Sequence, residues 1–491
     1  MLRGGPVRSW VVRVALAGLA WSAGWLVPHQ ALGAEPSRDE APGGAPRDAA
    51  GPSEEEAHGT SRRPEHDPAE LSGIEEPASQ PGDAGRTAAD VLLFVPRNFV
   101  DLLFRGTTAA AGLARDEQIV PRVAEALSTP RGQLIVFPTM FVETGEALSF
   151  GARMIGKAGQ FTTSYRFGYG IPEDFVMESR VRYYQGGPLP FALTVEGYVE
   201  QEGEQEFLGV GLVPERDPRN RFLQPGPGGA RVGLYSEERL RGLVSAGFRP
   251  SQLFEFFLSA SLGRRAVEDT TGAGSQALSR VFAPESIPGS FDRNWIFYGE
   301  GAARLDSRPT RGRPSPGALV EAYYGGALST AYPGPVSGDD VAFVRTGGRV
   351  AGFFPIYRRT NILSPRVVLD RLEPLNGLPV PFTELPRQPD FRGFDDRRDL
   401  LSVVASLDYT WELVEFLGAR LFFDAATVAP RLSGVTAETF EEMRYAGGFG
   451  LDLYVSSDDV GQVGFAVSPE GARLWLTVGV PSDHGDRQHR D

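Results

Sequence analysis

The sequence of 491 residues contains no cysteine, so disulfides and thiolate metal sites are excluded. Histidine is almost as scarce, and no histidine lies between residues 67 and 483. A Ser–His catalytic centre or a histidine-bound metal is therefore excluded from this long central part. We expect the protein not to be an enzyme and to hold no metal or cofactor. The histidines are His29, His58, His66, His484 and His489.

Long apolar runs are also missing. Beyond the N-terminal segment, no run reaches the ~18 apolar residues that a membrane-spanning helix needs. A transmembrane β-barrel escapes this test, because its strands alternate lipid-facing and lumen-facing side chains. The 41% hydrophobic content fits that class, and the 60 glycines and 31 phenylalanines suit tight turns and aromatic girdles. A soluble, secreted β-protein would fit these counts equally well.

Positive charge is in deficit, with a formal net charge of −14. We therefore expect no nucleic-acid partner, because an acidic protein repels the phosphate backbone. Acidic residues are frequent in residues 35–87, which include Glu54-Glu55-Glu56 and are rich in Pro, Gly and Ala. Such a stretch cannot bury enough apolar surface to offset its chain entropy. It is predicted to be a disordered linker.

The N-terminus has the pattern of an export signal. Residues 1–34 place arginines before and within an apolar stretch, Val11 to Val27, and end in Ala31-Leu32-Gly33-Ala34. This order is typical of a secretory signal peptide. A retained membrane anchor is the alternative, although the apolar stretch is short and Arg13 interrupts it.

Residues 88–131 follow the linker and have a helical pattern. Apolar residues recur from Val91 to Phe94 and from Phe99 to Phe104, and a second helical stretch runs from about Arg115 to Leu127. We predict two short periplasmic helices, which would lie on the membrane surface or dip into a barrel lumen. A simple lead-in segment is the alternative.

From about residue 132 onward the hydrophobic pattern has period two, which is typical of half-buried strands. In Leu400–Trp411 the odd positions are apolar or aromatic and most even positions are polar. About sixteen such segments run through residues 132–491, an even number as a closed antiparallel barrel requires. Fourteen or eighteen strands, or a water-soluble sandwich, are the alternatives. The longest insertions fall near 214–228, 264–291 and 372–398.

The sequence thus predicts an all-β protein, a transmembrane antiparallel barrel of about sixteen strands. The disordered N-terminal linker and the short helical segment would precede the barrel. The barrel would lie in the bacterial outer membrane, in contact with its lipid.

One candidate site lies in the last long insertion, at Phe391-Arg392-Gly393-Phe394. The strand after it places Asp408 on its polar face, and the next strand directs Phe422 and Asp424 to the same inner side. A bidentate contact between the guanidinium and these carboxylates would tie the loop down inside the barrel, with Gly393 allowing a sharp reversal. The alternative is a surface arginine in a flexible loop.

These residues resemble the surface-antigen barrels of the BamA/TamA outer-membrane assembly superfamily, over the last ~110 residues. The resemblance includes Asp408-Tyr409, Phe422-Phe423-Asp424-Ala425-Ala426 and Ser468-Pro469-Glu470-Gly471. It implies that Arg392 folds into the lumen and pairs with Asp424, and also with Asp408, where the family usually has a glutamate.

Three departures distinguish this chain from the family pattern. Ala426 replaces the glycine that normally ends the strand motif, and the last predicted strand, Ala472–Val480, is followed by Pro481 and a polar tail, not by an aromatic end. Residues 88–131 are also too few for a periplasmic POTRA module. The chain resembles the subgroup that lacks these modules.

Two functions remain open. The first is assistance to insertion or transport of proteins or lipids, with unfolded outer-membrane clients or a separate periplasmic protein as partners. An edge strand could template a client strand if the barrel opens at its seam. The second is a passive pore or structural barrel without insertase activity, with a mixed-charge lumen.

Overall fold

The protein is described by a computed structural model that covers the central and C-terminal parts of the chain. The structure describes residues 134–478, apart from 144–147, 171–173, 188–189, 224–230, 271–272, 288–294, 311–312, 331–340, 357–359, 376, 379, 389–390, 394–396, 415, 436–438, 440 and 456–457. The predicted signal peptide, linker and helical segment, residues 1–131, lie outside the described residues and stay predictions.

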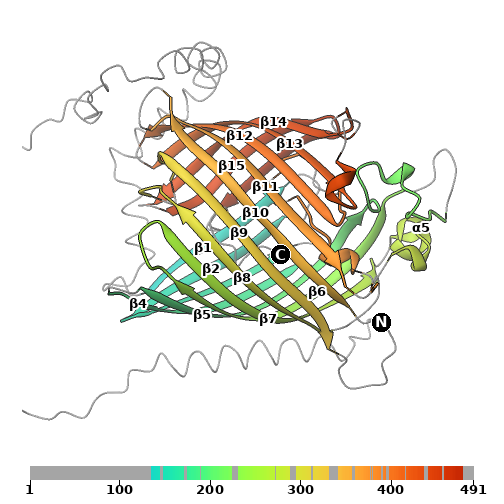
Figure 1. Cartoon of the computed structure of the whole chain (residues 1–491), viewed down its shortest axis with the longest axis horizontal. Helices are drawn as coiled ribbons and strands as arrows, with labels where there is room; N and C mark the ends of the chain where they lie inside the picture. The colour runs from blue at the N-terminus through green and yellow to red at the C-terminus, as the bar shows by residue number, and fades with distance from the viewer. Residues whose placement is uncertain are drawn as a thin grey trace, which may run out of the picture. The chain divides into compact units, whose positions relative to one another are not determined.

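Sixteen antiparallel strands form one closed barrel, in which each strand pairs with its sequence neighbours and β1 pairs with β16 (Figure 1). The predicted fold class and strand count are confirmed. The strands are β1 Leu134–Glu143, β2 Ser149–Ala158, β3 Phe161–Gly170, β4 Phe175–Gln185, β5 Phe191–Phe207, β6 Gly233–Phe248, β7 Phe254–Asp269, β8 Trp295–Asp306, β9 Gly317–Thr330, β10 Ala342–Pro355, β11 Ile362–Pro374, β12 Leu401–Val414, β13 Leu417–Ala429, β14 Arg444–Val455, β15 Asp458–Ser468 and β16 Gly471–Val478.

The two ends of the barrel differ in the length of their connections. An even strand count places the start of β1 and the end of β16 at one end, which also carries the tight turn 159–160. We call this the short-turn end. The opposite, long-loop end carries the connections 208–232, 270–294 and 375–400. This asymmetry matches the outer-membrane pattern of short periplasmic turns and long external loops.

Two predicted insertions begin later than expected. β7 continues to Asp269 and β11 continues to Pro374, so the loops after them start at residues 270 and 375. The sequence pattern loses its clean alternation at these strand ends, because the strands extend into the loop-covered mouth of the barrel. There, inward residues such as Val267 and Leu372 are buried among loop side chains.

Alternating side chains give the barrel two different faces. On β12, Leu407 points outward and is 44% exposed, whereas Asp408 points into the lumen. Outward phenylalanines, leucines, valines and tyrosines are exposed on nearly every strand, and such a surface is stable only against lipid. The chain is therefore a barrel of the outer-membrane type. In the described part of the chain, no helix is long and apolar enough to cross a membrane.

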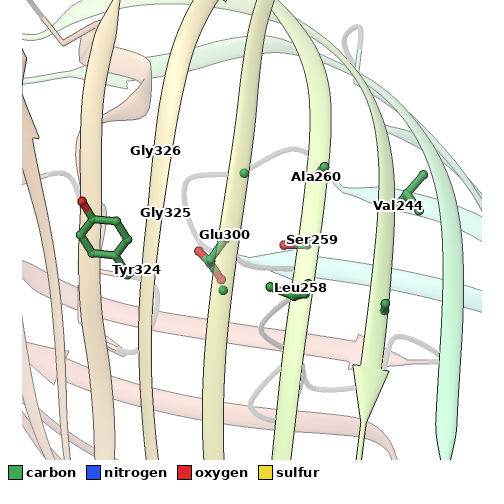
Figure 2. Close-up of a pocket in the computed structure, with 11 residues that line it drawn as sticks. Val244, Leu258, Ser259, Ala260, Glu300, Tyr324, Gly325 and Gly326 are labelled. Atoms are coloured by element: carbon green, nitrogen blue, oxygen red, sulfur yellow. The ribbon is translucent and has the colours of Figure 1, made fainter.

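A shallow hollow marks one part of the outer face (Figure 2). It has a volume of ≈ 460 Å³ and lies across β6, β7, β8 and β9, where small residues leave a depression between Leu258 and Tyr324. The hollow is largely apolar and open to the surroundings of the barrel. The small residues in its lining are Ala246, Ala260, Gly299, Gly301, Gly325 and Gly326.

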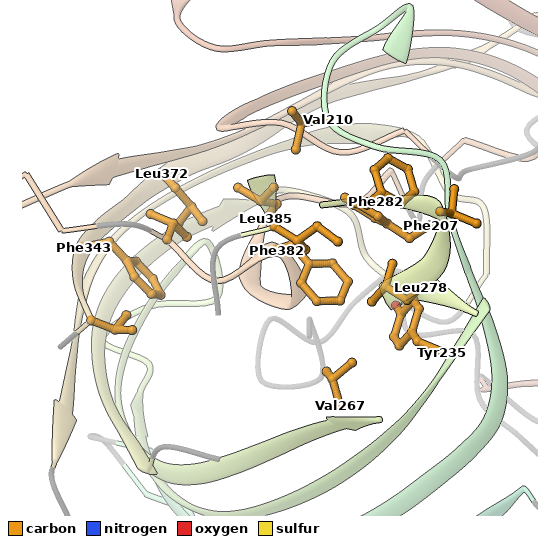
Figure 3. Close-up of a cluster of buried hydrophobic side chains, with 14 of the residues drawn as sticks. Phe207, Val210, Tyr235, Val267, Leu278, Phe282, Phe343, Leu372, Phe382 and Leu385 are labelled. Atoms are coloured by element: carbon orange, nitrogen blue, oxygen red, sulfur yellow. The ribbon is translucent and has the colours of Figure 1, made fainter. Parts of the chain in front are cut away.

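The largest hydrophobic core of the described residues lies inside the barrel toward the long-loop end (Figure 3). Inward side chains of the strands, such as Phe343 and Leu372, meet loop residues such as Phe382 and Leu278. Leu278 belongs to α5, Leu278–Val281, and Phe382 to η4, Phe382–Glu384. We call this group of residues the lumen cap. It is a packed group of side chains inside the barrel near the mouth.

The outward face can be tested with a charge. Val350 lies near the middle of β10 and is 56% exposed on the lipid side. We expect Val350→Arg to lower the free energy of unfolding in lipid vesicles by about 2–4 kcal/mol, because a charge at the bilayer midplane is poorly solvated. A denaturant titration measures this. Leu432→Arg is the control, because Leu432 is 59% exposed in the connection after β13, and an equal loss there would contradict the membrane placement.

Candidate functional site

The loop between β11 and β12, residues 375–400, carries the predicted site and lies inside the barrel. Arg392 meets both predicted carboxylates there. Its Nε and Nη2 donate to Asp424 Oδ2 and Oδ1 at 2.8 and 2.6 Å, and its Nη1 donates to Asp408 Oδ1 at 2.5 Å. The backbone N–H of Arg392 donates to Asp424 as well, at 3.0 Å. The arginine thus binds Asp424 by both its backbone and its side chain.

Burial makes this contact energetically important. The Asp424 side chain is 0% exposed and that of Arg392 is 12% exposed. Burial acts to lower the pKa of Arg392, but the carboxylates of Asp408 and Asp424 outweigh it and raise this pKa above its ordinary value. The guanidinium stays charged, and it lies 3.8 Å from the centre of the Phe422 ring, so that its remaining face contacts an aromatic surface.

Gly393 is required by space. A Cβ at this position would lie 2.6 Å from the Phe391 ring and 3.1 Å from the Ala446 side chain, and the backbone has no positive φ. Space, and not a left-handed backbone conformation, accounts for this glycine in the structure. Phe391 itself packs against Val404, Ala426 and Ala446. Phe394 lies outside the described residues.

The alanine that departs from the family pattern has a clear place in this packing. Ala426 is fully buried, points into the lumen and belongs to the cluster around Phe391. Its methyl group fills space that a glycine would leave open. The alanine thus fits on the same inner face of β13 as Asp424, which lies two residues before it.

The loop also contacts the strand that closes the barrel, a link that the sequence reasoning did not find. Arg473 of β16 donates from Nη1 to the carbonyl oxygen of Gly393. Trp475 of the same strand lies with its ring centre 5.9 Å from that of Phe422. Glu470, in the turn before β16, accepts from Arg444 Nε at 2.8 Å. The conspicuous Ser468-Pro469-Glu470-Gly471 segment was a sequence signal for this region, but not for these contacts.

The pairing that closes the barrel is short. β1 and β16 pair over four residues each, Met140–Glu143 with Trp475–Val478, within the described part of the chain. β1 pairs with β2, and β15 with β16, over eight residues each. We call the β1–β16 pairing the seam. With half as many pairs, it is the boundary at which the described sheet is held by the fewest backbone hydrogen bonds.

The first half of the loop packs against aromatic side chains of β5 and β6 inside the barrel. The rings of Phe207 and Phe382 lie 4.8 Å apart, and those of Tyr235 and Phe382 lie 5.2 Å apart. Arg398 is buried beside them and donates to the Tyr235 hydroxyl at 3.0 Å. Figure 3 shows Phe382 near Phe207 and Tyr235, at one side of the barrel interior. One loop therefore contributes Phe382 and Leu385 to the lumen cap and also makes the Arg392 contact.

Below the lumen cap the inner wall is lined by ion pairs. Arg265 contacts Glu237 at 3.0 Å and Glu384 of the loop at 2.8 Å, and Arg304 contacts Glu321 at 2.7 Å. These charges are mostly buried, so each depends on its partners. The described residues contain no group of three or more His, Asp or Glu side chains that could hold a metal ion. The arrangement can fix the loop inside the barrel.

Comparison with solved structures gives distant likenesses. BamA from Haemophilus ducreyi lacking POTRA domains 1–3 is 12% identical, with a TM-score of 0.47, over 70% of each chain. CdiB from Acinetobacter baumannii is 8% identical, with a TM-score of 0.42, over 71% of this chain and 60% of that chain. The FrpB iron transporter from Neisseria meningitidis (F5-1 variant) is 11% identical, with a TM-score of 0.30, over 67% and 54%.

No protein-family model and no curated protein matches the chain. The barrel fold that the resemblance implied is confirmed by the closed sheet of this chain itself. What the barrel does has to be argued from its own residues.

The arginine contact gives a direct prediction. Arg392→Ala leaves the buried Asp424 carboxylate without its guanidinium, and removing one partner of a buried pair costs about 3–5 kcal/mol. We expect a lower unfolding temperature in semi-native gels and faster proteolysis within residues 375–400. Arg371→Ala is the matched control, because its pair with Glu373 is exposed. Equal behaviour of the two variants would contradict the structural role of Arg392.

Proposed function

We propose that this protein is a bacterial outer-membrane barrel of the BamA/TamA type, exported by its N-terminal signal, that assists unfolded client proteins at its seam and catalyses no reaction. The observation that carries the proposal is the contact of Arg392 with Asp424 and Asp408 beside a short seam. The same loop touches the closing strand through Gly393 and Arg473. The Arg392 contact and the seam are thus physically connected.

The seam offers the chemistry that a client strand needs. Strand edges present backbone N–H and C=O groups in a row, and an extended segment can pair with them. With four pairs joining β1 to β16 among the described residues, few of the described hydrogen bonds separate the closed state from one in which these strands part. A separate periplasmic protein or residues 88–131 would supply the contact that delivers the client.

The lumen cap argues against the passive pore. Its fully buried rings, among them Phe207, Phe282 and Phe382, occupy space inside the barrel that a wide pore would need. The loop is fixed by buried ion pairs at both of its ends, which favours one closed arrangement. A barrel of this kind would pass solutes only after the loop leaves the lumen.

Conductance in planar bilayers separates a closed barrel from a pore. We expect the intact protein to show no large steady channel, because the lumen cap and the loop 375–400 occupy space inside the barrel. Replacing residues 375–400 by a short Gly-Ser linker should produce large openings, since this loop contributes Phe382 and Leu385 to the lumen cap and makes the Arg392 contact. Large steady channels in the intact protein would favour the pore function.

A disulfide across the seam tests the client-handling role, and the chain has no cysteine of its own to interfere. Val142 and Leu476 are register partners across the seam, so Val142→Cys with Leu476→Cys should lock it. We expect the oxidised variant to lose, and the reduced variant to retain, insertion of an unfolded barrel protein into vesicles.

The control bridges two neighbouring strands away from the seam. Met154→Cys with Tyr165→Cys joins β2 and β3 at register partners and should leave insertion unchanged when oxidised. Full insertion by the oxidised seam variant would overturn the role of the seam. Equal loss in both variants would show that rigidity of the barrel in general, and not seam opening, is needed.

A further inference from the structure

Three side chains on the outer face are buried where a lipid-facing barrel should expose them. Tyr409 and Trp411 on β12 are each 4% exposed, and Ala419 on β13 is 0% exposed. Asp408 and Arg420, their neighbours along the strands, point into the lumen, so these three point outward. We call Tyr409, Trp411 and Ala419 the covered patch.

Neighbouring outward positions show what exposure is normal here. Leu407 on β12 is 44% exposed and Phe423 on β13 is 51% exposed, although both lie on the same two strands and the same face. The stacked rings of Tyr409 and Trp411 are 5.4 Å apart and can shield only one side of each other. On a convex barrel surface, large aromatic side chains reach such burial only beneath further protein.

The polar group of the patch is also satisfied without water. Asn361, which is itself 4% exposed, donates from Nδ2 to the Tyr409 hydroxyl at 3.2 Å. A tyrosine of an interfacial girdle directs its hydroxyl to water or lipid headgroups, as its apolar ring stays in the membrane. The covered patch instead has the properties of a protein–protein contact, apolar and with its polar group paired.

The location of the patch identifies what can reach it. β12 ends and β13 begins at the short-turn end, where β1 also begins at Leu134. Around the ring, β1 and β12 are separated by five strand-to-strand steps through β16, β15, β14 and β13. At about 4.8 Å per step this is roughly 24 Å. Residues 105–133 can span that distance even when helical, at about 1.5 Å per residue.

We propose that residues 88–104 dock on the covered patch, on the outside of the barrel at the short-turn end, with residues 105–133 as the connection to β1. Its apolar residues, Val91 to Phe94 and Phe99 to Phe104, supply the hydrophobic side chains that an aromatic surface buries. Partly buried residues around the patch extend the surface to the width of a helix: Ile356, Leu363, Leu413, Leu421, Phe449 and Leu451. The segment thus packs against the outer face of β11 to β14. Two of these strands, β12 and β13, bind Arg392 on their inner face.

Cross-linking of the full-length chain tests this, since the chain has no cysteine of its own and only the introduced pair can react. Phe99→Cys is combined with Leu421→Cys at the patch, and the protein in outer-membrane vesicles is treated with a short bis-maleimide. We expect an intramolecular cross-link, seen as a shifted monomer band. The control combines Phe99→Cys with Phe167→Cys, an outward position on β3 that is 49% exposed, and should give no shifted band.

A second readout does not depend on the cross-linker. Deleting residues 88–104 should make Leu421→Cys more reactive toward a water-soluble maleimide in detergent, and leave Phe167→Cys unchanged. Dimer-sized cross-links in place of the shifted monomer would overturn the proposal in favour of a second copy. Absence of a cross-link together with unchanged reactivity after the deletion would overturn it as well.

Discussion

The structure depends on one buried carboxylate and the arginine that neutralises it. Asp424 has no exposure on the inner wall of β13, and an isolated charge at such a place is very costly. Arg392 removes that cost by binding both carboxylate oxygens and by reaching Asp408 on the adjacent strand. Because the arginine belongs to a loop, neutralising the charge obliges residues 375–400 to enter the barrel.

The position of that loop determines the rest of the interior. Its first half brings Phe382 into the lumen cap, and Glu384 pairs with Arg265 on β7. Its second half brings Gly393 to Arg473 on the closing strand. A single segment therefore connects the β7 side of the wall with the seam. We expect movement of the loop and opening of the barrel to be coupled, since the loop contacts both the β7 wall and the closing strand.

The barrel and the arginine contact could both be predicted from the sequence, for different reasons. The strands follow from period-two alternation, which is a local pattern, and Arg392, Asp408 and Asp424 follow from strand faces together with a family motif. The lumen cap, the Arg473 contact and the space-limited Gly393 could not be predicted. They join residues far apart in the chain, in loops without periodicity, and depend on how strands curve around a common lumen.

Hydrogen exchange at the seam tests most directly whether the arginine contact controls barrel closure. Backbone amides of Trp475–Val478, which pair with β1, are measured in the wild type and in Arg392→Ala. The account predicts faster exchange at these amides in the variant, with amides of β3 unchanged. Seam amides that exchange at the wild-type rate, while residues 375–400 lose protection, would show that the loop and the seam are independent.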